Sequence, residues 1–351
     1  MSNSCEVLQA IPKLDRAAEI DIEARHLPTT KALGMTRKAE KDTFIFKVGE
    51  ELKYPQTLTK RNVLKTGARI FDPLGFIAPI TVKGKILMQE IWLNRIDLDE
   101  KVSEGIAQKF HQWFSELTEL KKVEIQRCII ENNVDYLVTE LTLHTFVHDS
   151  ANAYGASVYA RCEHENAPLS VRFIAGKSRV ALLESTSIPR LELLAAMIGL
   201  KLAQATCKAL NIDISTVTFW SDSRNVLQWI RNQSRQFKTF VANRIGVIHR
   251  TTTPQQWRHV SSKENPADVV SRGQTLNELI DSKFWWQGPE FLKKPESERP
   301  VNKVEMRGCS KDEMKSKVML FNSDTEKDAK WRLKAKNYSQ WKKCLSEYLL
   351  G

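Results

Sequence analysis

The sequence contains no continuous apolar run of about eighteen residues, so no membrane-spanning helix is expected. Its first residues, MSNSCEVLQAIPKLDRAAE, lack a basic stretch followed by an apolar core, and a secretory signal is not expected either. The six cysteines form no C-x-x-C pair and no cysteine–histidine cluster. This scatter argues against a zinc site and a disulfide framework, and it favours a reducing, cytoplasmic location.

The composition indicates a folded protein with an anionic partner. Of 351 residues, 42% are hydrophobic and 27% are charged, which is typical of a globular chain. Lysine and arginine number 53 against 42 aspartates and glutamates, giving a net charge of +11. Such an excess favours nucleic acid over a membrane as the partner. The alternative is that the charge serves solubility alone.

Residues 1–125 are predicted to be mainly helical with a small strand component. The segment DTFIFKV (42–48) alternates apolar and polar residues as a half-buried strand does. Helices are predicted at 60–70, 81–92 and 103–121, and the prolines and glycine of FDPLGFIAPI predict a turn between the first two.

Residues 135–275 are predicted to form an α/β domain. Three strands with short links, at about 143–148, 154–161 and 170–178, predict an antiparallel meander. A helix (189–209), a strand (216–220), helices (223–232 and 238–250), a strand (256–260) and a short helix (266–271) follow. Beyond 276, a Trp- and Pro-containing tail, a charged linker (293–330) and a basic helix (328–350) are expected.

Four acidic residues lie where predicted strands end or helices begin. Asp149 follows the first strand, Glu192 lies in the first turn of the helix from Pro189, Asp222 ends the fourth strand, and Asp268 lies in the last short helix. Ligands of open α/β sheets gather at such strand ends. Four carboxylates meeting there would bind Mg²⁺, and two such ions about 4 Å apart can hydrolyse a phosphodiester.

Each carboxylate also has a structural alternative. Asp149 suits a turn, Asp222 suits the N-cap of the helix beginning at Ser223, and Asp268 suits an exposed helical position. Glu192 near a helix N-terminus is favoured by the helix dipole. However, its helix, LELLAAMIGLKLA, is apolar nearly all round, and a buried charge is costly unless it is paired or bound to metal.

Several motifs resemble the ribonuclease H domain of BEL/Pao-type retrotransposon Pol polyproteins. They are FVHDSANAYGASVYAR, AGKSRVALLESTSIPRLELLAAMIGLKLA, VTFWSDSRNVLQWI, FKTFVANRI and WRHVSSKENPADVVSRG, and they span about 140–273. Upstream, TKRNVLKTGARIFDPLGFIAPITVKGKILMQEIW resembles the segment after the reverse transcriptase palm, so residues 1–125 correspond to the end of the palm, the thumb and the connection. FWWQGPEFL resembles the tail after the ribonuclease H, and residues 276–351 would lead toward an integrase region.

The resemblance implies a ribonuclease H-like mixed five-stranded sheet flanked by helices. It further implies Mg²⁺-dependent (or Mn²⁺-dependent) cleavage of the RNA strand of RNA–DNA hybrids by a two-metal mechanism. Asp149, Glu192, Asp222 and Asp268 match the four catalytic, metal-binding carboxylates. The implied partners are the hybrid and the rest of the Pol polyprotein, in the cytoplasm or in element-derived particles. The loop histidine of many ribonucleases H is absent from SSKENP, where Lys263 is the candidate to supply a charge.

Other Pol activities lack their motifs here. The sequence has no Y-x-D-D, no Asp-Thr/Ser-Gly, no zinc module of the H-x-H and C-x-x-C type and no D…D-E core. Polymerase, peptidase and integrase activities are therefore not expected of this chain. The alternative to an active ribonuclease H is an inactive nucleic-acid-binding remnant.

Binding to a hybrid should rest on basic side chains that neutralise phosphates. Trp285 and Trp286 are expected to be packing anchors rather than stacking platforms. The candidate contacts near the site are Lys177, Arg179, Arg190 and Arg224, with Lys238 and Arg244 (beside Arg235 and Arg250) on the helix at 238–250 and Lys60, Arg61, Lys65, Lys83 and Lys85 in the first region.

Overall fold

The computed structural model describes residues 29–32, 35–38, 40–46, 52–129, 138–165, 167–181, 186–300 and 311–315. Everything described up to Met314 belongs to one unit. The basic helix predicted at 328–350 lies outside the described residues, as does most of the predicted linker.

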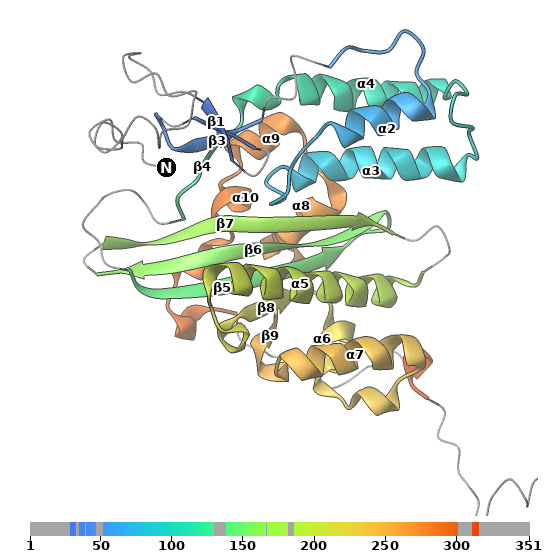
Figure 1. The fold of residues 1–351 in the computed structure, drawn as a ribbon. Helices are drawn as coiled ribbons and strands as arrows, with labels where there is room; N and C mark the ends of the chain where they lie inside the picture. The colour runs from blue at the N-terminus through green and yellow to red at the C-terminus, as the bar shows by residue number, and fades with distance from the viewer. Residues whose placement is uncertain are drawn as a thin grey trace, which may run out of the picture. The chain divides into compact units, whose positions relative to one another are not determined.

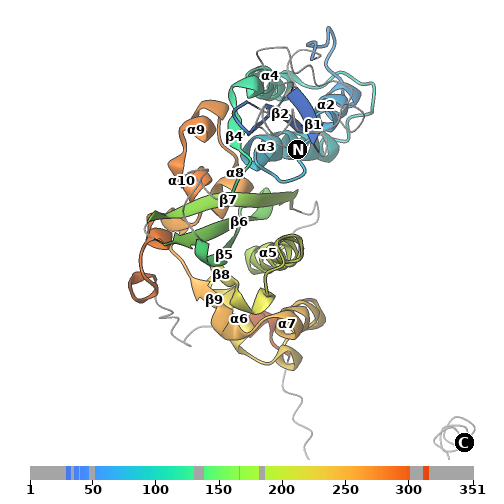
Figure 2. The same ribbon diagram turned by 60° about the vertical axis from the view of Figure 1, so that its left-hand side comes forward.

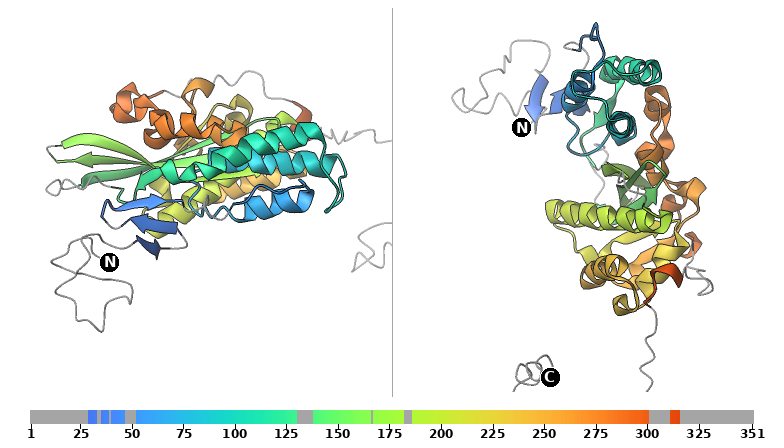
Figure 3. Two further views of the ribbon diagram at one scale, coloured as in Figure 1. Left: turned by 90° about the horizontal axis from the view of Figure 1, so that it is seen from above. Right: turned by 90° about the vertical axis from the view of Figure 1, so that its right-hand side faces the viewer.

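The first region combines a small antiparallel sheet with three helices, as predicted. The sheet has the order β1-β2-β3-β4, formed by Thr29–Ala32, Met35–Lys38, Thr43–Ile45 and Glu124–Gln126. The helices are α2 (Lys60–Ala68), α3 (Ala78–Leu93) and α4 (Glu104–Thr118), and Figure 3, left, shows them in blue to teal. The helix α3 begins earlier than the predicted residue 81, because Pro79 occupies the first turn, where its missing N–H is not needed.

The second sheet has five strands in the order β7-β6-β5-β8-β9. These are β5 (Val138–Asp149), β6 (Ala153–His164), β7 (Ala167–Val180), β8 (Thr218–Ser221) and β9 (Trp257–His259). The strands β5, β6 and β7 form the predicted antiparallel meander, while β8 and β9 run parallel to β5, so the mixed five-stranded sheet is confirmed. The meander strands extend beyond the predicted ends. In β5 the five residues before the predicted start are half-buried or exposed, so they lack a strong apolar pattern.

Helices cover both faces of this sheet, as Figures 1 and 2 show. The long helix α5 (Ile188–Leu210) packs on β5 and β6, and α6 (Arg224–Arg231) and α7 (Thr239–Thr251) pack against it. The opposite face carries α8 (Ala267–Arg272), α9 (Leu276–Asp281) and α10 (Lys283–Gln287). A Cβ added to Gly199 of α5 would overlap Val147 Cγ1, so this glycine lets the helix approach β5 closely.

By length and composition alone, α5 is long and apolar enough to cross a membrane. The mean hydropathy of its most apolar 18-residue window is 1.4, and half of that window is buried inside the protein. Leu193, Ala196 and Leu200 of this helix are fully buried. Packing against β5 and β6 therefore accounts for its apolar sequence.

The turn before α3 lies against the edge strand β7. Asp72 accepts hydrogen bonds from the backbone N–H groups of Phe76 (2.9 Å) and Ile77 (3.0 Å), which fixes the turn. The N–H of Gly176 on β7 donates to the carbonyl of Leu74 at 2.8 Å. Gly75 has a φ of +72°, and a Cβ there would overlap the Gly176 carbonyl. Glycine is thus required both by conformation and by close approach.

The tail after α8 is part of the core. Trp285 is fully buried, its Nε1 donates to the carbonyl of Phe76 (3.0 Å), and its ring centroid lies 4.4 Å from that of Phe173. The predicted packing role of Trp285 is thereby confirmed. One hydrophobic cluster joins first-region residues such as Phe110 with the sheet and the tail, so packing is continuous across the predicted boundaries near 125–135 and 275.

Candidate functional site

The candidate site lies at the carboxyl ends of β5 and β8. These parallel neighbours pair Val147 with Ser221, so the residues that follow, Asp149 and Asp222, leave the sheet at the same edge. Ser150 forms the turn after β5, since its Oγ accepts from the N–H of Ala153 at 3.1 Å. The turn residue is therefore Ser150, and Asp149 is the last residue of the strand.

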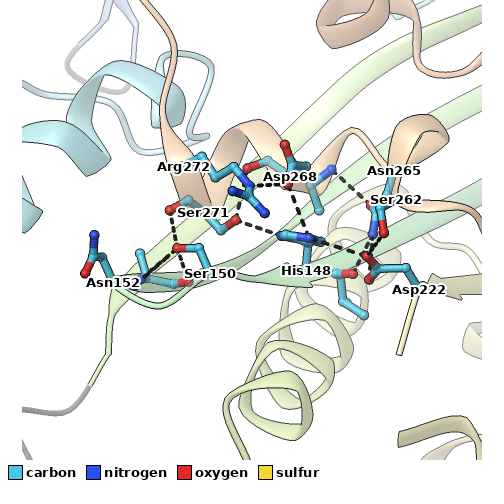
Figure 4. A network of polar contacts seen from close by, with 12 residues as sticks. His148, Ser150, Asn152, Asp222, Ser262, Asn265, Asp268, Ser271 and Arg272 are labelled. Carbon is cyan, nitrogen blue, oxygen red and sulfur yellow. Dashed lines mark hydrogen bonds and ion pairs between the residues drawn. The ribbon is translucent and has the colours of Figure 1, made fainter. Parts of the chain in front are cut away.

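Asp222 does not cap α6, so the structural alternative considered for it is wrong. The N-cap is Ser223, whose Oγ accepts from the N–H of Val226 at 3.1 Å. A serine directly before the helix has the shorter reach to that N–H. The Asp222 carboxylate instead accepts from Ser262 Oγ (2.7 Å) and Asn265 Nδ2 (3.3 Å), as Figure 4 shows.

Asn265 fixes Asp222 against the sheet. It is fully buried, and its Nδ2 also donates to the carbonyl of Val147 on β5 at 2.9 Å. Its Oδ1 accepts from the N–H of Ala267, the first residue of α8. One side chain thus connects β5, Asp222 and the start of α8. Sequence reasoning did not single out Asn265 or Ser262, although both lie in the quoted SSKENPAD.

Glu192 lies in the second turn of α5 rather than in the predicted first turn, because the helix begins at Ile188. Burial raises the pKa of its carboxyl, a hydrogen bond from Ser223 lowers it, and the charge of Asp222 raises it further. Among the described residues, its Oε2 is buried without a hydrogen-bond partner. An unpartnered buried carboxylate oxygen is costly unless a cation or a proton compensates it.

Burial and neighbouring charges also act on Asp149. Burial raises its pKa to about 8, and the charges of Glu192 and Asp222 contribute to the increase. The carboxyl group therefore holds its proton at neutral pH. Asp149, Glu192 and Asp222 thus form one electrostatically coupled group at the sheet edge.

Asp268 joins this group from the other side, through a histidine. Its Oδ1 lies 2.6 Å from Arg272 Nε and 3.3 Å from His148 Nε2, and the same Nε2 lies 3.4 Å from Asp222 Oδ2. His148 is buried, and its Nδ1 lies 2.8 Å from Ser271 Oγ (Figure 4). Sequence reasoning missed His148, although it directly precedes Asp149 in the quoted motif FVHDS.

Within the described ranges, no three His, Cys, Asp or Glu side chains are grouped so that they could hold a metal ion. The donor chemistry nevertheless suits a hard divalent cation, which prefers carboxylate oxygens. Glu192 Oε2 has no partner among the described residues, and burial together with the charges of Glu192 and Asp222 raises the pKa of Asp149. Both observations fit a group of carboxyls that a cation would stabilise in the ionised form. Asp149, Glu192 and Asp222 are the residues that such a cation would neutralise.

Three of the predicted nucleic-acid contacts are exposed near this edge. Arg179 of β7 pairs with Tyr154, which pairs in turn with Asp149, so Arg179 lies in the same row of the sheet, two strands away. Lys177 is exposed on the same strand, and Arg224 is the exposed first residue of α6.

The other predicted contacts engage other parts of the protein. Arg190 forms an ion pair with Glu313, with Nε at 2.6 Å from Oε1, and both Arg190 and Arg244 stack on the ring of Phe240. The Lys238 side chain is exposed, while its backbone N–H donates to the Glu313 carbonyl at 2.8 Å.

First-region candidates are paired as well. The ion pairs are Arg61–Asp99 and Lys83–Glu116, Lys60 donates to the Ile96 carbonyl and lies over the Trp92 ring, and Lys85 donates to Ser178 on β7. Lys263 is exposed in a short 3₁₀ turn (Ser262–Glu264) before α8.

Comparison with solved structures returns distant matches. The foamy viral protease-reverse transcriptase dRH in complex with ds DNA is 11% identical, with 67% of this chain and 38% of that chain covered and a TM-score of 0.37. LC11-RNase H1 in complex with RNA/DNA hybrid is 16% identical, with 40% of this chain and 97% of that chain covered and a TM-score of 0.23. RNase H1 from the halophilic archaeon Halobacterium salinarum NRC-1 is 12% identical, with 40% of this chain and 97% of that chain covered and a TM-score of 0.21. The chain thus spans about two fifths of the foamy viral structure. No curated protein matches it.

A protein-family comparison identifies the central part of the chain. Residues 59–223 match the family described as the Pao retrotransposon-like RNaseH-like domain. The match begins at Thr59, the N-cap of α2, and ends at Ser223, the N-cap of α6, so it contains α2 to α5 and β5 to β8. Asp149, Glu192 and Asp222 lie inside it, and Asp268 lies beyond it. Residues 59–223, slightly less than half of the chain, are thus similar to the Pao retrotransposon-like RNaseH-like domain.

Proposed function

We propose that the chain is a divalent-metal-dependent ribonuclease H that cleaves the RNA strand of RNA–DNA hybrids. The observation that carries the proposal is the coupled group of Asp149, Glu192 and Asp222 at the edge of an RNase H-like sheet. A partly buried cluster of repelling carboxylates is unfavourable by itself. A structural role gives no reason to retain it, whereas a cation-binding role does.

Asp149, Glu192 and Asp222 would hold the metal, with Asp268 as the fourth carboxylate. Two bound Mg²⁺ or Mn²⁺ ions would supply an activated water and stabilise the leaving oxygen. The protein's own groups prepare the site. Asp149 must release the proton that its raised pKa retains, and Ser262 and Asn265 hold Asp222 in one orientation.

The exposed cations near the edge would contact the hybrid backbone. Arg179 shares a row of the sheet with Asp149, and Arg224 lies two residues after Asp222. Such contacts fix the register of a duplex without reading its sequence. Selection of RNA over DNA would come from groove shape and 2′-hydroxyl contacts. The rest of a Pol polyprotein is the proposed protein partner.

A second candidate function is hybrid binding without hydrolysis. The observation that favours it is the ion pair between Asp268 and Arg272 at 2.6 Å, which already compensates the fourth carboxylate. Under this alternative, the basic residues bind the duplex, and the carboxylates do not bind two metal ions.

Cleavage of a labelled RNA–DNA hybrid by the purified full chain distinguishes the two functions. We expect Mg²⁺-dependent cleavage that Asp222→Asn lowers roughly a hundredfold or more, because a carboxylate ligand is lost. The matched control is Asp213→Asn, which changes an exposed aspartate that caps the short turn before β8. Salt-dependent hybrid binding without metal-dependent cleavage would establish the second function instead.

A further inference from the structure

His148 and Asp149 are neighbours on β5, so their side chains point to opposite faces of the sheet. Asp149 is coupled to Glu192 on the α5 side, whereas His148 contacts Ser271 of α8 on the other side. His148 is 6% exposed. Its imidazole therefore approaches the candidate site from the face opposite Glu192.

The two ring nitrogens of His148 have different partners. Nε2 faces two carboxylate oxygens, at 3.4 Å from Asp222 Oδ2 and 3.3 Å from Asp268 Oδ1. Ionised carboxylates only accept hydrogen bonds, so these neighbours favour the tautomer with its proton on Nε2. Nδ1 is then the acceptor. The Ser271 hydroxyl lies 2.8 Å from Nδ1 and 3.0 Å from the Asp268 carbonyl, and with this tautomer it donates to Nδ1.

We propose that His148 is a positioning residue of the metal site, which keeps the carboxylates of Asp222 and Asp268 directed toward each other through its Nε2–H. The role deepens the proposed function and rests on it. Ser262 and Asn265 already hold Asp222 in place. Because His148 contacts both Asp222 and Asp268, it orients the Asp268 carboxylate relative to the fixed Asp222. Without it, Asp268 is left with its ion pair to Arg272, an exposed side chain.

A second buried histidine on β5, His144, has contacts that differ from those of His148. His144 lies four residues earlier on the same face and is 1% exposed. Its Nδ1 accepts from Trp220 Nε1 at 3.2 Å, and the charged groups that act on it are arginines rather than carboxylates. His144 therefore supplies a matched control, because it has the same residue type, strand, face and burial.

The test measures Mn²⁺ binding to the purified full chain by electron paramagnetic resonance, independently of cleavage. Residues that orient metal ligands typically contribute ten- to a hundredfold in metal affinity. We expect His148→Leu to weaken Mn²⁺ binding by about tenfold or more. His148→Gln, which can place an amide N–H near the position of Nε2, should restore binding to within about threefold of wild type. His144→Leu should lower the melting temperature and leave Mn²⁺ affinity unchanged.

Ser271→Ala is a second variant that keeps the imidazole and removes the hydroxyl that contacts Nδ1 and the Asp268 carbonyl, and it should weaken Mn²⁺ binding several-fold. Wild-type affinity in folded His148→Leu, or in Ser271→Ala where His148→Leu does not fold, would overturn the proposal. Absence of Mn²⁺ binding by the wild-type chain would overturn it too. Mn²⁺ binding with the expected variant pattern but without hybrid cleavage would support the positioning role and reject the proposed function.

Discussion

Two partly buried aspartates of this chain have pKa values that burial raises to different extents. Asp72 lies in the turn before α3, where burial raises its pKa to about 6 while hydrogen bonds from backbone N–H groups oppose the increase. Asp149 has two like-charged neighbours in addition to burial, and its pKa reaches about 8. Hydrogen bonds that compensate a charge are typical of a structural aspartate, and uncompensated repulsion is typical of a binding site.

Asp149 should make the stability of the cation-free protein depend on pH. Its carboxyl ionises near pH 3.8 when unfolded and near pH 8 when folded, so the folded state binds more protons between these values. Stability therefore falls as pH rises from about 4 to about 8. Asp149→Asn removes this loss, and each pKa unit corresponds to about 1.4 kcal/mol. Urea unfolding in EDTA should show a gain from the substitution that is larger at pH 8 than at pH 5.

Asp213→Asn provides the comparison at this scale. That aspartate is exposed, and the hydrogen bond from Ser215 lowers its pKa. Its substitution should therefore cause no stabilisation that grows between pH 5 and pH 8. An equal effect of Asp149→Asn at both pH values would show that the pKa of Asp149 is not raised in the folded protein.

At the scale of elements, α5 determines where Glu192 lies, and Gly199 determines how closely α5 packs. Gly199→Ala should destabilise the protein by about 1–3 kcal/mol, because a Cβ would overlap Val147 and separate helix from sheet. Alanine at Gly246 of α7 is the control, since its nearest neighbour would be Arg250 Nη1 at 4.0 Å. There alanine should stabilise by roughly 0.5–1 kcal/mol, as in an open helix position. Urea unfolding measures both, and equal effects would contradict the packing role.

Apolar patterning predicted the elements of the α/β region, because most have an apolar face at strand or helix spacing and α5 is a long apolar run. Periodicity did not predict the helix cap or the histidine at the site, because both depend on contacts between residues that are distant in sequence. Ser223 and Asp222 are adjacent polar residues, and the cap could be assigned only once Ser262 and Asn265 were seen to bind Asp222. His148 reads as an ordinary strand residue, since its contact with Ser271 joins positions 123 apart.

At the scale of the molecule, the helices of the first region, the five-stranded sheet and the tail share one hydrophobic cluster. Trp285 connects all three, through Phe76 in the first region and Phe173 on β7. The protein should accordingly unfold as one cooperative unit over these parts.

Trp285→Ala should lower the free energy of unfolding by about 3–5 kcal/mol, because a fully buried indole is replaced by a cavity. Trp92→Ala, at a side chain that is 54% exposed, should cost far less. Far-UV circular dichroism and tryptophan fluorescence should report the same urea midpoint for each variant. Separate midpoints would show that the tail unfolds independently of the sheet.

The contact between the Leu74–Gly75 backbone and Gly176 bears on self-association. β7 is an edge strand of 14 residues, and an edge of that length offers unpaired backbone groups to any similar strand. The turn before α3 already occupies the Gly176 N–H, and its left-handed glycine places backbone directly against that strand. At Gly176, a strand from a second copy therefore finds the backbone N–H of this edge already hydrogen-bonded and cannot pair with it. The same turn that joins the first region to the sheet thus also opposes edge-to-edge aggregation.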